Sequence, residues 1–184
     1  PPHVNFSTYD FRVVDGCIRY GLGGAKGVGG PAVEALVQNR AEKGEFESFD
    51  NFVERVDMSR CGKAAMESMI KAGAFDGMGA NRCQMFEGLL DAMQMAQSEA
   101  KKQDQGQMML FTIDEPAVQA TSHLPDLPEW PERDKLAKEK EVLGFYVSSH
   151  PLASVQDTLR YFSSHHILNL ADLEDGTEVV VGGM

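Results

Sequence analysis

The chain has 184 residues, a formal net charge of -11 and 42% hydrophobic residues, values typical of a folded protein with one ordinary domain or two small ones. Its three cysteines lie far apart without a Cys-x-x-Cys pair, which argues against a zinc site or disulfide framework and favours a reducing compartment. No apolar run approaches the roughly 20 residues of a membrane span, and the first residues lack a signal-peptide pattern. We therefore expect a cytoplasmic protein without a membrane partner.

The acidic charge is unevenly distributed along the chain. Residues 17–102 hold eleven Lys and Arg against twelve Asp and Glu, whereas residues 103–184 hold five against fourteen. Proteins that bind nucleic acid usually present a basic surface, so binding in the first segment would depend on backbone amides and a few cations, with weak affinity in isolation. The candidate cations are Lys26, Lys63, Lys71 and Arg82.

Residues 11–20 predict a β-hairpin. Two short β-prone runs flank Asp15 and Gly16, and an Asp-Gly pair is a strong local signal for a two-residue turn. The chain starts with Pro1 and lacks an initiator Met, so we expect it to be a piece of a longer protein.

A glycine-rich turn at residues 26–30 runs into a predicted helix from Pro31 to about Lys43. Glycine accepts the backbone angles of a tight turn and lets a ligand approach the N–H groups, and the helix N-terminus adds partial positive charge. This pattern is typical of a helix-hairpin-helix, a module that binds the backbone of duplex DNA. The alternative is a plain helix–helix turn that uses glycine only for tightness.

A second unit follows the first. An aromatic cluster at residues 46–53 predicts a core that packs the two halves of a small helical unit, and a second glycine-rich turn at 73–79 joins predicted helices at 63–72 and 81–102. Two such units in tandem form a pseudo-symmetric DNA-binding domain in many enzymes, so the duplication favours the DNA-binding interpretation. The predicted contacts with the DNA backbone are Lys26, Gly27, Val28, Gly29, Gly30, Gly73, Gly77, Gly79 and Arg82.

Polar residues and prolines dominate residues 102–130, which predicts a mobile linker. One apolar island interrupts it, and such an island either docks on its own protein or binds a partner. The island consists of Gln107, Met108, Met109, Leu110 and Phe111. Beyond it we expect a helix at 132–147, a shorter helix at 152–162 and a β run at 177–181 that begins a further β domain.

Several motifs occur in one order along nearly the whole chain: Pro1–Asn5, Ile18–Gly23, Lys26–Gly29, Met69–Asp76, Leu143–Tyr146 and Ser149–Leu152. Together they resemble the bacterial replicative DNA polymerase III alpha subunits. Two positions depart from the family pattern, Gly24-Ala25 and Gly30-Pro31. The first departure could loosen the helix before the hairpin, and neither removes Gly27 or Gly29.

The resemblance implies a mainly α-helical fold. Its implied parts are 1–20, the end of the fingers with the β-hairpin; 21–100, a tandem helix-hairpin-helix domain; 101–131, a flexible linker; 132–175, a helical connector; and 176–184, a truncated OB-fold strand. The implied partners are double-stranded DNA, bound without sequence preference, the sliding clamp and other holoenzyme subunits. The resemblance also implies that the island at 107–111 is the peptide that binds the sliding clamp. Leu110 and Phe111 would fill an apolar pocket on the clamp, while Gln107 anchors the peptide backbone by hydrogen bonds. Met109 stands where a small polar residue is common.

The parent enzyme would catalyse template-directed DNA synthesis in chromosome replication, with Mg²⁺ in its own active site. This segment lacks closely spaced carboxylates on β structure and a His pattern for metal binding, so we expect it to hold no catalytic residue and no cofactor. Two alternatives remain: a tandem module of a DNA ligase or repair enzyme, and a helical scaffold that binds only proteins.

Overall fold

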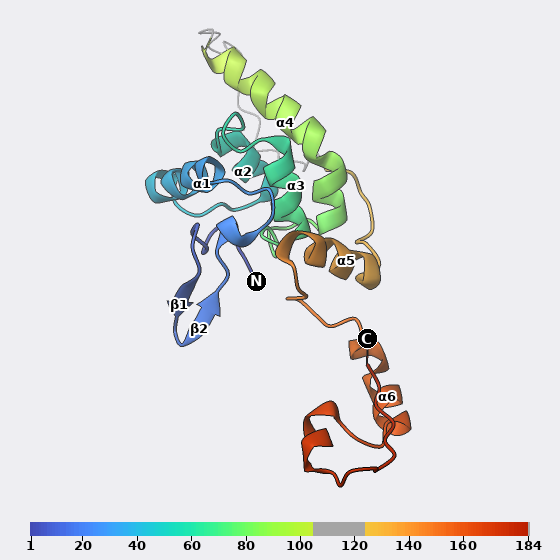
Figure 1. Ribbon diagram of the computed structural model, residues 1–184. Helices are drawn as coiled ribbons and strands as arrows, with labels where there is room; N and C mark the ends of the chain where they lie inside the picture. Colours follow the sequence, from blue (N-terminus) through green and yellow to red (C-terminus); the bar gives the residue numbers. More distant parts are fainter. Residues whose placement is uncertain (105–123, 184) are drawn as a thin grey trace. The chain divides into compact units, whose positions relative to one another are not determined.

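The computed structural model describes residues 1–104 and 124–183. The chain forms two compact units, Pro1–Phe145 and Tyr146–Met184. Both contain helices, and the first also carries a two-stranded sheet (Figure 1). The prediction of a mainly helical fold with a short N-terminal β-hairpin is confirmed.

The predicted β-hairpin consists of β1 (Arg12–Val14) and β2 (Cys17–Arg19), which pair antiparallel. Asp15 and Gly16 form the turn with φ angles of 52° and 75°. Positive φ at both central positions matches the twist of a two-residue hairpin, and Asp and Gly tolerate it. The hairpin projects from the helices of the first unit (Figure 1).

The helical part of the first unit contains the two predicted hairpins. Its elements are η1 (Leu22–Gly24), α1 (Gly30–Lys43), α2 (Phe49–Arg55), α3 (Lys63–Lys71), α4 (Arg82–Asp104) and α5 (Glu132–Leu143). The helices predicted from residues 31, 63 and 81 are confirmed as α1, α3 and α4. The aromatic residues at α2 predicted a core cluster but no helix. In the structure, the Ser48 hydroxyl accepts a hydrogen bond from the Asn51 N–H at 3.1 Å. This N-cap begins α2.

The core of the first unit is aromatic, as predicted. The Phe75 ring meets the rings of Phe49 and Phe52 edge to face, at centroid distances of 5.1 and 4.9 Å. All three side chains are buried. Phe46 packs on Phe52 from the side of the α1–α2 connection, at 4.7 Å. Edge-to-face pairs of this kind add to the free energy gained by burial, so this cluster joins α2 to the turn after α3.

The end of the predicted linker is packed on α4. The Leu127 carbonyl accepts a hydrogen bond from the Asn81 side chain at 2.8 Å, and the Trp130 ring meets the Phe86 ring at 5.5 Å. Residues 124–131 therefore differ from the expected mobile linker. The following helix α5 ends four residues earlier than expected, because Gly144 adopts a left-handed conformation at its C-terminus.

The second unit contains η2 (Ala153–Val155), α6 (Gln156–Phe162) and η3 (Ile167–Asp172). The prediction of a strand at 177–181 is wrong. In the described part of the chain these residues form no strand and pair with none. Val180 is linked to Ser164 and His165, whose N–H groups donate to the Val180 carbonyl at 2.9 and 3.4 Å. An isolated strand is unstable without neighbours, so the predicted OB-fold start remains irregular.

Candidate nucleic-acid interface

The first glycine turn, between η1 and α1, leaves several backbone donors open. Gly27 adopts a φ of 87°, which favours glycine. Among the described residues, the N–H groups of Gly27, Gly29 and Gly30 donate to no acceptor. The N–H groups of Lys26 and Val28 are engaged, because they donate to the carbonyls of Val142 at 2.8 Å and Ala25 at 3.1 Å. The turn thus offers the amides of the three glycines, whereas the Val28 amide, also predicted as a contact, is engaged.

The N-terminus of α1 has no competing anion of its own. Gly29 at the N-cap provides no side-chain acceptor, Pro31 lies in the first turn, and that turn contains no acidic residue. Helix N-termini attract anions through their free N–H groups and the helix dipole. This end of α1 is therefore suited to a phosphate.

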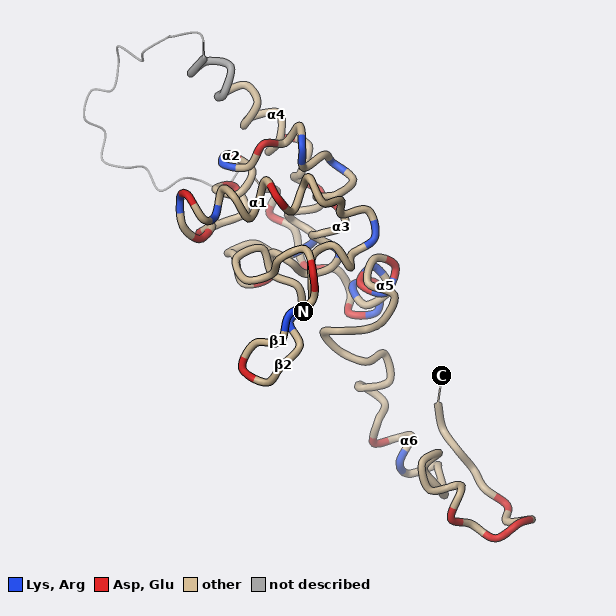
Figure 2. Tube along the Cα trace, turned by 60° about the vertical axis from the view of Figure 1, so that its left-hand side comes forward, with Lys and Arg blue, Asp and Glu red and all other residues tan. Residues whose placement is uncertain are grey.

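The predicted cations differ in their surroundings. Lys63 pairs with Glu67 at 3.3 Å, and Lys71 pairs with Glu141 at 3.1 Å. Lys26 is exposed beside the first turn and takes part in no ion pair within the described residues. Acidic and basic residues alternate along the helices of the first unit (Figure 2). A DNA contact here would therefore depend on the amides and Lys26.

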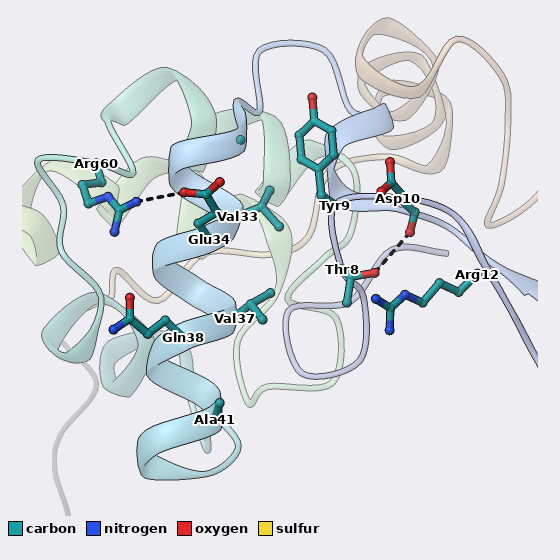
Figure 3. Close-up of a pocket in the computed structure, with 11 residues that line it drawn as sticks. Thr8, Tyr9, Asp10, Arg12, Val33, Glu34, Val37, Gln38, Ala41 and Arg60 are labelled. Carbon is teal, nitrogen blue, oxygen red and sulfur yellow. Dashed lines mark hydrogen bonds and ion pairs between the residues drawn. The ribbon is translucent and has the colours of Figure 1, made fainter.

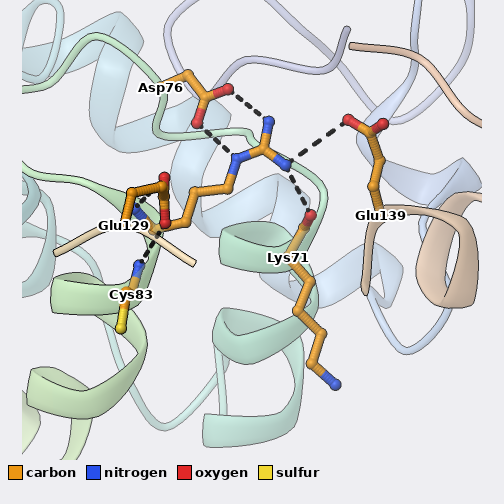
Figure 4. A network of polar contacts seen from close by, with 6 residues as sticks. Lys71, Asp76, Cys83, Glu129 and Glu139 are labelled. Carbon is orange, nitrogen blue, oxygen red and sulfur yellow. Dashed lines mark hydrogen bonds and ion pairs between the residues drawn. The ribbon is translucent and has the colours of Figure 1, made fainter. Parts of the chain in front are cut away.

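The second hairpin places its predicted arginine, Arg82, in the interior. Figure 4 shows Asp76, Glu139 and Lys71, the residues with which it interacts. Arg82 is 1% exposed; its Nε donates to Asp76 Oδ1 at 2.8 Å, and its Nη1 donates to the Lys71 carbonyl at 3.1 Å and lies 3.6 Å from Glu139 Oε1. Burial alone would lower the pKa of Arg82, but the hydrogen bonds and charge of Asp76, together with Glu139, raise it. The prediction that Arg82 contacts DNA is wrong, because a side chain so buried cannot reach a phosphate.

Gly73 shares this interior position. Its N–H donates to the Ile70 carbonyl at 3.0 Å, and a side chain added at Gly73 would collide with the Arg82 guanidinium. Gly73 therefore makes room for Arg82 and is closed to a ligand. Gly77 and Gly79 are exposed, and in the described residues their N–H groups donate to no acceptor.

A carboxylate covers the N-terminus of α4. Glu129 accepts hydrogen bonds from the N–H groups of Arg82 at 3.2 Å and Cys83 at 3.1 Å. Asn81 and Gln84 exchange further hydrogen bonds at 2.8 and 3.0 Å in a capping box. The two hairpins are therefore unequal, since α1 begins with free donors and α4 begins with donors that the protein itself satisfies.

Sequence reasoning missed the roles of Glu129 and Glu139. The pattern Asn81-x-x-Gln84 signalled a capped helix start, but no local pattern connects Glu129 with a helix 47 residues earlier. Glu139 lies on the strongly charged helix α5, yet its side chain is fully buried. Long-range contacts decide both positions.

Other predicted features lie outside this interface. The apolar island at 107–111 falls outside the described residues. Within the described residues, no group of three or more His, Cys, Asp and Glu side chains could hold a metal ion, and no helix there is long and apolar enough to cross a membrane.

Comparison with known proteins agrees with the motifs. A family model described as a helix-hairpin-helix motif matches residues 1–85. The DNA polymerase III subunit alpha of Mycobacterium leprae is 39% identical over 188 residues, covering 100% of this chain and 16% of the relative. That of Borreliella burgdorferi is 36% identical over 169 residues, covering 91% and 15%.

The same protein of Vibrio cholerae is 32% identical over 186 residues, covering 100% of this chain and 16% of the relative. The chain thus spans about 16% of the length of these relatives. On this evidence the chain is similar along its length to a segment of DNA polymerase III alpha subunits, and it contains a helix-hairpin-helix motif.

Proposed function

We propose that this chain holds the sugar–phosphate backbone of duplex DNA through its first hairpin. The observation that carries the proposal is the group of three free N–H donors at Gly27, Gly29 and Gly30, beside a helix N-terminus without acidic residues. Lys26 adds a positive charge next to them. Exposed Gly77 and Gly79 offer a smaller second contact. Contacts to phosphates position a duplex but read no sequence.

The relatives' names support a place for this contact in replication. As part of a DNA polymerase III alpha subunit, the chain would hold duplex DNA while the parent protein performs template-directed synthesis. The parent's Mg²⁺ would be bound by carboxylates outside this segment. A ligase or repair-enzyme module fits the whole-chain similarity less well. A protein-binding scaffold would differ in having no DNA affinity.

The substitution Gly29→Asp tests the DNA contact. Gly29 has extended backbone angles that any residue adopts, and an added side chain would meet only Pro31 at 3.7 Å. An Asp there should cap α1 through the Ala32 N–H, because Pro31 has no N–H, and stabilise the helix by roughly a few tenths of a kcal/mol relative to Gly. Its negative charge should repel a phosphate from the free donors beside it. We expect at least tenfold weaker binding of a labelled duplex at low salt, by fluorescence anisotropy on the 184-residue chain.

Two matched variants separate the causes. Gly29→Asn should cap the helix without adding charge and weaken binding less, and Gln97→Glu adds the same charge on the exposed surface of α4. Only Gly29→Asp should lose most of the affinity. Equal binding by Gly29→Asp and the unmodified chain, or no salt-dependent binding by the unmodified chain, would refute the proposal.

We further propose that residues 107–111 bind the sliding clamp. The support is the sequence, in which Gln107 opens the island and Leu110-Phe111 closes it between two polar stretches. Apolar anchors of this kind contribute most of the binding energy of short peptides. The triple variant Gln107→Ala, Leu110→Ala, Phe111→Ala should abolish binding of the chain to purified clamp in a surface-binding assay. Unchanged binding would refute this role.

A further inference from the structure

The β1–β2 hairpin places two arginines side by side. Arg12 pairs directly with Arg19 in the strand register, and Val13 pairs with Ile18. Because opposed residues of a sheet share a face and successive residues alternate, both guanidinium groups belong to one face. The side chains of Val13 and Ile18 belong to the opposite face of the hairpin. Like charges directly opposite each other destabilise a strand pair, so this arrangement calls for a counter-charge.

The described part of the protein does not provide that counter-charge directly. Neither the Arg12 nor the Arg19 guanidinium forms an ion pair or donates a hydrogen bond within the described residues. Asp10 and Asp15 are near in sequence, but neither forms an ion pair with these arginines in the same set of residues. Arg19 lies over the Phe6 ring at 5.2 Å, a contact with the face of the guanidinium that leaves N–H groups at its edge for an acceptor.

The arginine hairpin is fixed next to the first glycine turn. The Gly23 N–H donates to the Tyr9 carbonyl at 3.0 Å, and a side chain at Gly21 would lie within 2.7 Å of the backbone of residues 9–11. The Tyr9 ring also lies against Gly30, 3.9 Å from the position of a side chain there. The segment that leads into β1 therefore packs on the turn and on the first residue of α1.

One groove connects the two features (Figure 3). It has a volume of about 680 Å³, and its lining includes both Arg12 and Gly30. Its acidic members are Asp10 and Glu34, and the Glu34 carboxylate is paired with Arg60 at 3.2 Å. Arg12 and Gly30 thus line one groove, which runs along α1 from its first turn to Ala41.

We propose that the Arg12–Arg19 face of the β1–β2 hairpin binds a second stretch of phosphodiester backbone on the duplex held by the first hairpin. Arginine presents planar, paired donors that match phosphate oxygens, and a polyanion removes the repulsion between the two guanidinium groups. A carboxylate of a protein partner could neutralise the pair as well, but the shared groove with the α1 donors favours DNA. This inference rests on the proposed function.

The double variant Arg12→Gln, Arg19→Gln tests it in the 184-residue chain. The logarithm of DNA affinity should be measured against the logarithm of salt concentration, because each neutralised phosphate adds about 0.9 to the slope. We expect the slope to fall by about 1.8 and the affinity at low salt to fall at least tenfold. Arg12→Lys, Arg19→Lys keeps both charges and should keep the slope. The control Lys43→Gln, Arg133→Gln removes two exposed charges elsewhere and should change it little.

The outcomes separate this inference from the proposed function. If the glutamine pair leaves the slope unchanged while Gly29→Asp still weakens binding, the arginine face does not contact DNA and the first hairpin does. If the unmodified chain shows no salt-dependent binding, both proposals are refuted. A thermal melt of each variant checks folding, and the glutamine pair should melt no lower than the control pair because it removes a repulsion. If the glutamine pair melts lower than the control pair, the salt dependence of Arg12→Lys, Arg19→Lys is compared with that of the unmodified chain instead. A slope that is lower by 1.8 in this lysine variant overturns the inference.

Discussion

Replacing Arg82 with alanine should strongly destabilise the first unit. The substitution removes the pair of hydrogen bonds to Asp76, the bond to the Lys71 carbonyl and the ion pair with Glu139. Because the Glu139 side chain is 0% exposed, its charge would stay buried and lose the ion pair with Arg82. Breaking a buried ion pair from one side costs about 3–5 kcal/mol, a large part of the roughly 5–15 kcal/mol that stabilises a typical domain.

Urea unfolding followed by circular dichroism measures this loss. Arg60→Ala is the matched control, since its ion pair with Glu34 has side chains that are 40% and 74% exposed. Exposed pairs contribute about 0–1 kcal/mol. The double variant Arg82→Leu, Glu139→Leu should recover stability relative to Arg82→Ala, because it removes the buried carboxylate together with the arginine. A loss for Arg82→Ala no larger than that for Arg60→Ala would refute the argument.

Three other outcomes are expected. Glu129→Gln weakens the acceptor of two amides at the start of α4 and should cost about 1 kcal/mol in urea unfolding; an unchanged midpoint would contradict this. Burial lowers the pKa of His3, so the unfolded chain binds more protons just below its ordinary pKa of about 6.5. The free energy of unfolding should therefore fall as the pH drops below that value and level off below the folded pKa, and His3→Gln should flatten this dependence. Burial raises the pKa of Cys61 to about 12, so iodoacetamide should modify exposed Cys17 in the native protein and Cys61 only after unfolding, as read by peptide mass spectrometry; early labelling of Cys61 would contradict its burial.

Local signals in the sequence were sufficient for the β-hairpin and for helices α1, α3 and α4. Asp15-Gly16 predicts the β-hairpin because the turn chemistry acts over two residues, and apolar spacing with a glycine before and after predicts α1. The glycine amides of the first turn, predicted as contacts, donate to no acceptor in the described residues, whereas the predicted Val28 amide is engaged. These features depend on neighbours along the chain.

Features set by distant contacts could not be predicted in the same way. Arg82 has the residue type and position of a phosphate-binding cation, but Glu139 and Asp76 hold it inside the unit. A strand prediction at 177–181 followed the β-branched run correctly, yet a strand needs a partner that the described residues do not contain. In both cases the residue pattern was compatible with two outcomes that only tertiary contacts distinguish.

The hydrogen bond from the Lys26 N–H to the Val142 carbonyl has a consequence for shortened forms of the chain. The residues that match the helix-hairpin-helix model end at 85, but the first turn is supported by the last residues of α5 through this bond of 2.8 Å and a contact between the Tyr20 hydroxyl and the Leu143 carbonyl at 3.4 Å. A protein cut after residue 85 would keep every glycine of the motif but lose the carbonyls of Val142 and Leu143 that accept these hydrogen bonds. The smallest autonomous form of the hairpin should therefore extend to residue 145.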